Sequence, residues 1–262
     1  MKRVRRIRRE LRRRLRPRAR DSALVAIESR IFTCPKLGEA ENTNADSAYV
    51  SSERGSVAIA DGVSRSFQPR QWSQLLVRAV TEVDEGSLTE LATKCSEATS
   101  HDSRDLSWPE KALRDRFGSQ ATLLSVKFHR LNRNEVLATA TAIGDCLLAR
   151  ISKKGAREYV QLWPFADTES FPAVPGNICS VSPHIRGQVV TAQLSLELED
   201  RLLLMTDALG RYFVRQVSEN RSVIESFPFL HQAMTFQEWS LVAVESGVVE
   251  DDDLTLVEIR VE

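Results

Sequence analysis

Residues 57–62, Val-Ala-Ile-Ala-Asp-Gly, join an uninterrupted apolar run to an acidic residue and a glycine. Short apolar runs that contain β-branched residues are typical of buried strands. A carboxylate directly after such a strand is held by the sheet, yet it is free to point into a cleft. Gly62 has no side chain, so its carbonyl group can closely approach a metal ion. The stretch therefore predicts a buried strand that carries Asp61 to a site at its end.

The same pattern recurs elsewhere in the chain. The apolar run Arg201–Met205 ends at Thr206-Asp207, Asp145 lies between two strand-like segments, and Asp251-Asp252-Asp253 precede the β-branched run Leu254–Val261. Carboxylates gathered in one place repel one another unless a cation lies among them. Oxygen ligands favour Mg²⁺ or Mn²⁺ over Zn²⁺. An Asp at a strand end is usually a turn or helix N-cap residue, so spacing alone predicts no more than a candidate acidic cleft.

The rest of the sequence contains more strand-like than helix-like segments, and the strand-like segments follow one another along the chain. Adjacent runs of strands favour antiparallel sheets flanked by helices, an α+β arrangement, over alternating strand–helix units. No linker or repeat interrupts the chain after residue 22, so residues 23–262 are expected to form one domain. We expect strands over 24–33, 49–50, 57–60, 121–128, 135–142, 146–151, 201–205 and 254–261, helices over 72–80, 208–217 and 236–244, a loop over 97–110 and an irregular stretch over 163–188.

Composition excludes several other classes of protein. The 262 residues are 42% hydrophobic, enough for a sizeable core. No apolar run approaches the roughly 18 residues of a membrane-spanning helix, and the run 23–27 is too short for a signal-peptide core. The four cysteines and four histidines are scattered, which argues against a zinc site or a disulfide framework. This cysteine usage fits a reducing cytosol, so we expect a cytoplasmic protein.

The first 22 residues form a separate basic tail. Residues 1–20 contain twelve Lys or Arg and one Glu, a formal charge of +11, and the rest of the chain carries −11. Val4, Ile7, Leu11 and Leu15 recur at helical spacing, which predicts a basic amphipathic helix. Such a helix could bind an anionic membrane, nucleic acid or an acidic protein. A disordered, solvated arm and an Arg-rich targeting peptide are the alternatives.

Taken together, the acidic segments resemble the motifs of the type 2C, metal-dependent (PPM) protein phosphatases, especially their compact bacterial branch. The resemblance runs from about Lys36 to Ile259, and six segments carry it in the family's order: Asn44-Ala45-Asp46, Ala60-Asp61-Gly62-Val63, Gly118-Ser119-Gln120-Ala121-Thr122, Ile143-Gly144-Asp145-Cys146, Thr206-Asp207-Ala208-Leu209 and Asp252-Asp253-Leu254-Thr255. It implies an αββα sandwich of two antiparallel sheets flanked by helices.

The resemblance also implies a function and a site. The function is a protein serine/threonine phosphatase that hydrolyses phosphoserine or phosphothreonine through a water activated by two Mn²⁺ or Mg²⁺ ions, with a third ion as a further option. An opposing serine/threonine kinase would be its partner in signalling. Asp61 would bridge the metals, Asp207 and Asp252 would complete one site, and the Gly62 carbonyl would serve the other. Further candidate ligands are Asp46, Asp145 and Asp253.

The chain departs from the family's motifs at three places, and the first and third departures motivate a second hypothesis. Ala45 stands where the family usually has Glu, Val63 stands where animal members often have His, and no Arg directly precedes the first motif. Lys36 is the nearest basic residue there, and Arg65 and Arg70 are candidate phosphate-binding substitutes. The alternative function is therefore a catalytically weak pseudophosphatase that binds phosphoproteins or another partner.

Overall fold

The structure is a computed structural model that describes residues 25, 27–83, 87–98, 106–132, 134–155, 157–182 and 184–261. The predicted basic tail, residues 1–22, lies outside the described residues. Most of the predicted domain, residues 23–262, lies within them.

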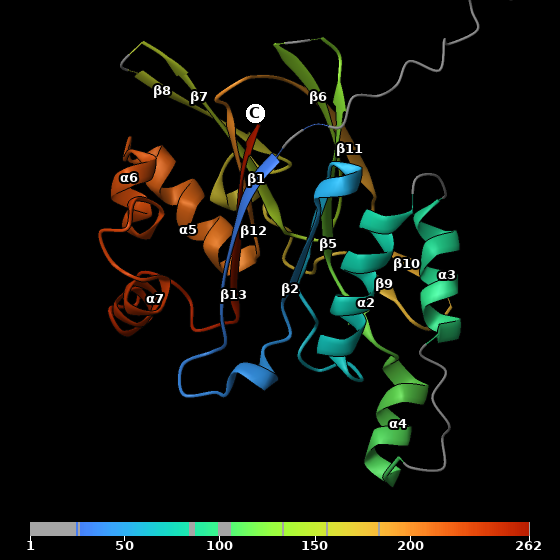
Figure 1. Cartoon of the computed structure of the whole chain (residues 1–262). Coiled ribbons are helices and arrows are strands. Elements are labelled where there is room, and N and C mark those ends of the chain that lie inside the picture. The colour runs from blue at the N-terminus through green and yellow to red at the C-terminus, as the bar shows by residue number, and fades with distance from the viewer. Residues whose placement is uncertain are drawn as a thin grey trace, which may run out of the picture.

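Two five-stranded sheets form the centre of the molecule (Figure 1). Every strand pair in them is antiparallel, as the sequence predicts. The first sheet has the order β1 (Ile27–Cys34), β13 (Leu254–Val261), β12 (Arg201–Met205), β7 (Leu147–Lys154), β8 (Arg157–Trp163). The second has the order β11 (Val190–Glu197), β6 (Glu135–Ile143), β5 (Leu123–Arg130), β3 (Ser56–Ala60), β2 (Ser47–Ser51).

The apolar strands are buried on both faces, which explains why their sequences do not alternate with polar residues. In β3, Val57 and Ile59 join the core between the two sheets, whereas Ala58 and Ala60 join the core beneath the helices of the second sheet. In β12, Leu202 and Leu204 face the core between the sheets. Successive side chains of a strand point to opposite faces, so one apolar run supplies two cores.

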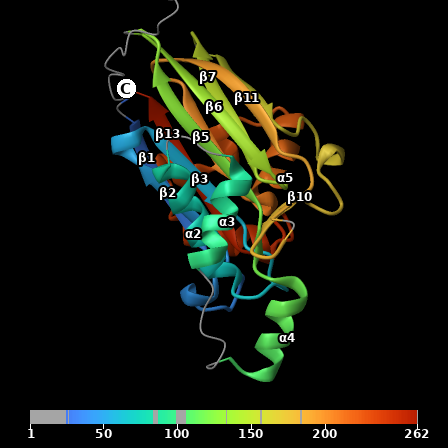
Figure 2. The ribbon, with the colours of Figure 1, turned by 90° about the vertical axis from the view of Figure 1, so that its right-hand side faces the viewer.

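Helices cover the outer face of each sheet. α2 (Pro69–Glu82) and α3 (Leu88–Ala98) lie on the second sheet, and the view in Figure 2 shows them in front of it. α5 (Asp207–Ser218) and α7 (Phe236–Glu245) cover the first sheet, together with α6 (Val223–Ser226) and the short helix η5 (Pro228–His231). The four layers form an αββα sandwich, so the predicted fold class is confirmed.

Several elements differ from the sequence-based predictions. α4 (Trp108–Phe117) begins inside the segment predicted as a loop, and it buries none of its residues, so no apolar stripe marks it in the sequence. A capping box between Ser107 and Glu110 starts this helix instead. The irregular stretch contains the short strands β9 (Asn177–Cys179) and β10 (Ile185–Arg186), which pair in a small sheet with β4 (Gln120–Ala121).

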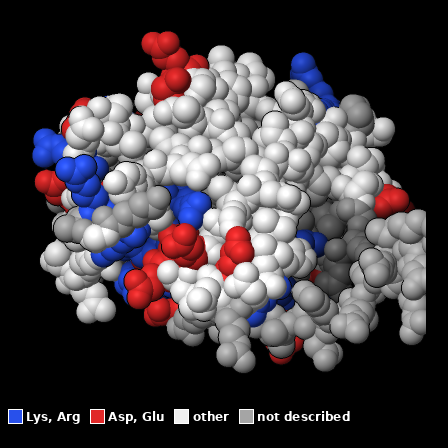
Figure 3. All heavy atoms as spheres, turned by 90° about the horizontal axis from the view of Figure 1, so that it is seen from above, with Lys and Arg blue, Asp and Glu red and all other residues white. Residues whose placement is uncertain are grey.

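The two ends of the sandwich have different features. The C-terminal end of β13 lies at the upper end in Figure 1, and β12, which runs antiparallel to β13, leads toward Asp207 at the opposite end. Seen from above (Figure 3), the upper end shows Lys and Arg near Asp and Glu with wide uncharged areas between them. Among the described residues, no helix has both the length and the apolar character that crossing a membrane requires.

Candidate metal centre

The two sheets bring Asp61 and Asp207 to the same end of the sandwich. Asp61 follows β3 of the second sheet, and Asp207 is the first residue of α5, which Thr206 separates from β12 of the first sheet. The negative charge of Asp207 acts on the Asp61 carboxyl, so the two groups are electrostatic neighbours. They are 146 positions apart in the sequence numbering, and only the packing of the sheets joins them.

The backbone around Asp61 is fixed by the segment that follows α4. The amide of Asp61 donates to Oγ1 of Thr122 at 3.2 Å, and its carbonyl accepts from the amide of Thr122 at 2.9 Å. Val63 donates in turn to the carbonyl of Gln120 at 2.9 Å. The motif Gly118–Thr122 therefore serves as a backbone clamp that holds Asp61 and Gly62 at the strand end.

Gly62 and Gly144 are both required by close packing. A Cβ atom at Gly62 would lie 2.7 Å from the carbonyl oxygen of Ala45 and 2.8 Å from that of Pro69. Gly144 has a φ of +101°, and a Cβ atom there would lie 2.6 Å from the side chain of Thr122 and 2.8 Å from the carbonyl oxygen of Gly176. Backbone atoms cannot give way as a flexible side chain can, so these positions admit no larger residue without movement.

Asp46 enters the site from the start of β2. Its amide donates to Oδ1 of Asn44 at 2.8 Å, and its Oδ2 accepts a 2.9 Å hydrogen bond from the hydroxyl of Thr206. Its other oxygen, Oδ1, is buried and has no hydrogen-bond partner among the described residues. Burial, followed by the charge of Asp61, raises the pKa of Asp46 well above its usual value.

Repulsion among the carboxylates shifts their protonation. Burial, followed by the charges of Asp207, Asp145 and Asp252, raises the pKa of Asp61 to about 8. Burial and the charge of Asp207 raise the pKa of Asp145 to about 7. Burial and the charge of Asp252 raise the pKa of Asp207. These groups form one acidic cluster, and a cation bound among them would stabilise their charged forms.

The two neighbouring acids Asp252 and Asp253 have different surroundings. Both oxygens of Asp253 accept backbone hydrogen bonds, Oδ2 from Ala45 at 2.7 Å and Oδ1 from Lys36 at 3.1 Å. Asp253 thus ties the start of β13 to the segment before β2. The side chain of Asp252 is 40% exposed, and its Oδ1 lies 2.9 Å from Nζ of Lys36.

Three arginines lie near the cluster in different settings. Arg65 is exposed on the loop after Gly62, whereas Nη1 of Arg70 donates to the carbonyl of Glu41 at 2.8 Å. The third, Arg211, was not predicted from the sequence. Its Nη2 lies 3.9 Å from Oδ2 of Asp145, and its Nε lies 4.0 Å from Oδ2 of Asp207. The spacing of four residues between Asp207 and Arg211 in a predicted helix was the available signal.

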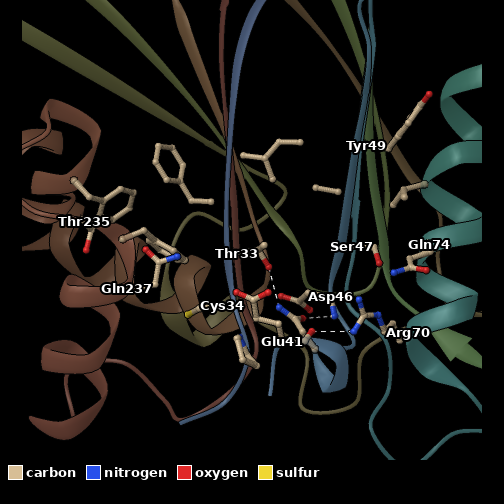
Figure 4. Close-up of a pocket in the computed structure, with 18 of the residues that line it drawn as sticks. Thr33, Cys34, Glu41, Asp46, Ser47, Tyr49, Arg70, Gln74, Thr235 and Gln237 are labelled. Carbon is tan, nitrogen blue, oxygen red and sulfur yellow. Dashed lines mark hydrogen bonds between the residues drawn. The ribbon is translucent and has the colours of Figure 1, made fainter. Parts of the chain in front are cut away.

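A large cavity of about 970 Å³ opens beside the cluster rather than over it. It lies between β1, β2, α2 and α7, where the edge strands of the two sheets face each other (Figure 4). Its lining includes Asp46 and Arg70 but none of Asp61, Asp145 and Asp207. Asp46 is therefore the point at which the acidic cluster meets this cavity.

The donor set of the cluster fits a hard divalent cation. All candidate side-chain ligands are carboxylates, and Oδ1 of both Asp46 and Asp145 is buried without a hydrogen-bond partner in the described part of the chain. Such orphaned acceptors are costly unless a cation or water binds them. In the described ranges, no group of three or more His, Cys, Asp or Glu side chains is already arranged to hold a metal ion. Asp61, Asp145 and Asp207 nonetheless lie close enough for their charges to act on one another.

Comparisons with known proteins bear on the fold. No family model and no curated protein matches the chain. The solved structure of the serine/threonine phosphatase PstP/Ppp of Mycobacterium tuberculosis is similar, with a TM-score of 0.57 and 17% identity over 91% of this chain and 100% of that one. The catalytic domain of PstP in complex with two manganese ions has a TM-score of 0.52 and 17% identity, over 90% and 99%.

RsbX in complex with magnesium is also similar, with a TM-score of 0.51 and 15% identity over 90% of this chain and 96% of that one. These neighbours match almost the whole of both chains, so the likeness extends through all four layers. The chain therefore has the fold of the type 2C, PPM-family phosphatases, in the compact form seen in bacterial proteins.

Proposed function

We propose that this chain is a metal-dependent protein serine/threonine phosphatase. The observation that carries the proposal is the acidic cluster, in which Asp61 and Asp207 arrive from different sheets and the charge of Asp207 raises the pKa of Asp61. A cluster of buried carboxylates destabilises the metal-free fold, so a cation-binding role explains its presence better than a structural one. Similar folds include a PstP domain in complex with manganese and RsbX in complex with magnesium, which supports Mn²⁺ or Mg²⁺ as the cofactor.

The residues proposed to hold two ions are Asp61, Asp207, Asp252 and the carbonyl of Gly62. Asp46 and Asp145 are the further candidates for ligands of these ions or a third, because each has an unpartnered buried oxygen among the described residues. Asp253 is a weaker candidate, since both of its oxygens already accept backbone hydrogen bonds. When bound, divalent cations lower the pKa of a water nucleophile and neutralise the charge of a phosphoryl group.

The protein's own groups would orient the substrate around this centre. The backbone clamp at Thr122 keeps Asp61 at the strand end, and the hydrogen bond from Thr206 holds Asp46 beside it. Arg65 and Arg70 are proposed to attract the phosphoryl group by charge. Positioning and charge neutralisation supply most of the acceleration in phosphoryl transfer, so a rigid acidic cluster suits this chemistry.

The deciding experiment is hydrolysis of p-nitrophenyl phosphate by the purified chain with Mn²⁺, Mg²⁺ or EDTA. We expect turnover that needs the metal and is lost in Asp207→Asn and Asp61→Asn, while circular dichroism shows that both variants stay folded. Glu219→Gln, a change of one exposed acid at the end of α5, is the matched control. Full activity in either Asp variant would show that the site is assigned wrongly. Release of phosphate from phosphoserine and phosphothreonine peptides, compared with phosphotyrosine peptides, then tests the substrate class.

A second candidate function is a pseudophosphatase that binds phosphoproteins. Two observations favour it: Ala45 supplies no carboxylate, and the side chain of Asp252 is already paired with Lys36. Calorimetry with Mn²⁺ separates the candidates, because a binding module of this kind would take up no metal at millimolar concentration. A folded chain that binds phosphopeptides without metal and hydrolyses none of them would support this alternative.

We further propose that the protein works in the cytoplasm opposite a serine/threonine kinase. All four cysteines are free thiols, which suits a reducing compartment.

We also propose that residues 1–22 are a basic tail outside the phosphatase-like domain of residues 23–262. The charge of +11 on residues 1–20 suits an anionic membrane, nucleic acid or an acidic protein. Binding to anionic vesicles, DNA or RNA should fall steeply with salt and disappear when residues 1–20 are deleted. Unchanged binding after the deletion would exclude the tail as the anchor.

A further inference from the structure

We propose that the guanidinium group of Arg211 binds the phosphate group of the substrate. This inference rests on the proposed phosphatase function and deepens it, because it names the group that recognises a phosphate dianion. The acidic cluster cannot recognise a dianion without cations, and a fixed positive side chain at its edge would complete the site. Four observations favour this assignment: the position of Arg211, its packing, its uncommitted N–H groups and the poorer fit of the other basic residues.

The position of Arg211 is set by helix geometry. It lies one turn after Asp207 on α5, and residues four apart lie on the same face of a helix. Its Nη2 is 3.9 Å from Asp145 and its Nε is 4.0 Å from Asp207. The group is therefore next to two members of the acidic cluster and on the same side of the helix as Asp207.

The side chain of Arg211 is held in place by an aromatic ring. Its Cζ lies 4.7 Å from the centre of the Phe171 ring, and Phe171 itself is buried and packs against Phe165 with ring centroids 4.4 Å apart. At Gly210, the preceding residue, an added Cβ atom would lie only 3.0 Å from Cβ of Leu147, so the glycine allows α5 to pack closely on β7 here. A guanidinium stacked on a ring keeps its in-plane N–H groups free to bind an anion.

The N–H groups of Arg211 have capacity for a further partner. Distances of 3.9 and 4.0 Å are long for a hydrogen bond, which needs about 2.7–3.2 Å. Within the described ranges, Arg211 thus attracts Asp145 and Asp207 by charge without a close hydrogen bond to either. A guanidinium carries five N–H donors in a planar fork, which matches two oxygens of a phosphate. The side chain is 32% exposed, so a ligand from solvent can reach it.

The other basic groups near the cluster are less suited to this role. Arg70 already donates to the carbonyl of Glu41, and it lines the cavity beside the cluster, as Figure 4 shows. Lys36 pairs with Asp252 at 2.9 Å, and Arg65 is exposed on its loop. Arg211 combines proximity to the cluster, fixation by an aromatic ring and uncommitted donors.

The experiment is calorimetric titration of the full chain with inorganic phosphate in the presence of Mg²⁺, which needs no turnover. We expect Arg211→Met to weaken phosphate binding roughly 10- to 100-fold, the loss typical of a charge-assisted hydrogen-bonded pair. Arg211→Lys keeps the positive charge but lacks the planar guanidinium that can donate to two phosphate oxygens. We expect this variant to bind phosphate several-fold more weakly than the unmodified chain. Arg116→Met is the matched control, because Arg116 is exposed on α4 and also lies over an aromatic ring, that of Phe117.

Mg²⁺ affinity, measured for each variant in the absence of phosphate, identifies a merely structural role. If Arg211 only compensates the charge of Asp145 and Asp207, Arg211→Met changes Mg²⁺ affinity and leaves phosphate affinity at saturating Mg²⁺ unchanged, which overturns the proposal. An unchanged phosphate affinity in Arg211→Lys also overturns it, and this variant carries the test if Arg211→Met does not fold. A loss in Arg65→Met or Arg70→Met, with none in Arg211→Met, would assign the role to that arginine instead.

The two proposals fail in distinguishable ways. Metal-dependent hydrolysis by the unmodified chain, with phosphate binding unaffected in both Arg211 variants, would keep the phosphatase function and reject the role of Arg211. Phosphate binding that depends on Arg211, in a chain that hydrolyses no phosphoester with any metal, would keep the binding group and reject the enzyme. In an active chain we expect Arg211→Lys to raise KM for a phosphopeptide more than it lowers kcat.

Discussion

The hydroxyl group of Thr206 donates a 2.9 Å hydrogen bond to Oδ2 of Asp46, and this bond joins the two sheets at the acidic end of the sandwich. Thr206 is fully buried and also accepts a 3.1 Å hydrogen bond from the amide of Thr255. One side chain thus connects the end of β12, the start of β13 and the start of β2. The bond also lowers the otherwise raised pKa of Asp46.

Replacement of Thr206 by Val should destabilise the protein. Val has nearly the same shape but leaves Oδ2 of Asp46 and the amide of Thr255 without this partner. Burial of unsatisfied polar groups costs about 1–3 kcal/mol, so we expect the free energy of unfolding to fall by about that amount. Urea denaturation measures the change, and Thr206→Ser, which keeps the hydroxyl, is the control. Equal stability of the Val and Ser variants would show that the hydrogen bond contributes nothing.

The stability of the metal-free protein should fall as the pH rises from about 4 to about 8. The pKa of Asp61 is raised to about 8 and that of Asp145 to about 7, so the folded state holds these protons at a pH where the unfolded chain releases them. The stabilisation is complete below the unfolded value, near 3.8, and is lost as the pH passes the folded values. Each such proton gives a slope of about 1.4 kcal/mol per pH unit.

Urea midpoints in EDTA across this pH range test the expected slope. Asp61→Asn should reduce it, because the variant lacks the group with the pKa near 8. Saturating Mn²⁺ should abolish or reverse it, since metal ligands bind in their deprotonated form. A stability that increases with pH in EDTA would contradict the mutual repulsion of the carboxylates.

Lys36 should compete with a metal ion for Asp252. Its ammonium group lies 2.9 Å from Oδ1 of Asp252, and this contact raises the pKa of Lys36. Both side chains are partly exposed, and exposed ion pairs contribute only about 0–1 kcal/mol. We therefore expect Lys36→Met to increase Mn²⁺ affinity by roughly two- to fivefold. Calorimetry measures this, with Lys94→Met, at an exposed position on α3, as the charge-matched control. Weaker Mn²⁺ binding in Lys36→Met would show that Lys36 supports the site.

Gly62→Ala should destabilise the fold through a backbone clash. The added Cβ atom would lie 2.7 and 2.8 Å from the carbonyl oxygens of Ala45 and Pro69. Overpacking of this kind costs about 1–3 kcal/mol, which thermal denaturation detects as a lower Tm. Gly247→Ala provides a comparison, because nothing lies within 4 Å of the added atom although φ is +68°. A Tm for Gly62→Ala that equals the unmodified chain's would contradict this close packing.

Local sequence patterns were sufficient for the fold class but not for every element. No strand is predicted over Val190–Glu197, although this segment forms β11 with alternating exposure directly after the proline-rich stretch. The helix α4 buries none of its residues, so the sequence marks it with a capping box at its start and with no apolar stripe along its length. Strands with both faces buried, such as β3 and β12, were predicted correctly, because a continuous apolar run that ends in Asp is a strong signal.

The sequence by itself determined the buried strands that end in Asp61 and Asp207, because an apolar run followed by an acidic residue is a local pattern. The resemblance of the six motifs to the type 2C phosphatases predicted the αββα fold and placed these two residues at one site. Tertiary structure alone decided which side chains surround them. The bond from Thr206 to Asp46 spans 160 positions, and Arg211 meets Asp145 only because α5 packs over β7. Local patterns specify which face of an element is buried, whereas side-chain partners depend on how whole sheets pack, and that packing is cooperative over the entire core.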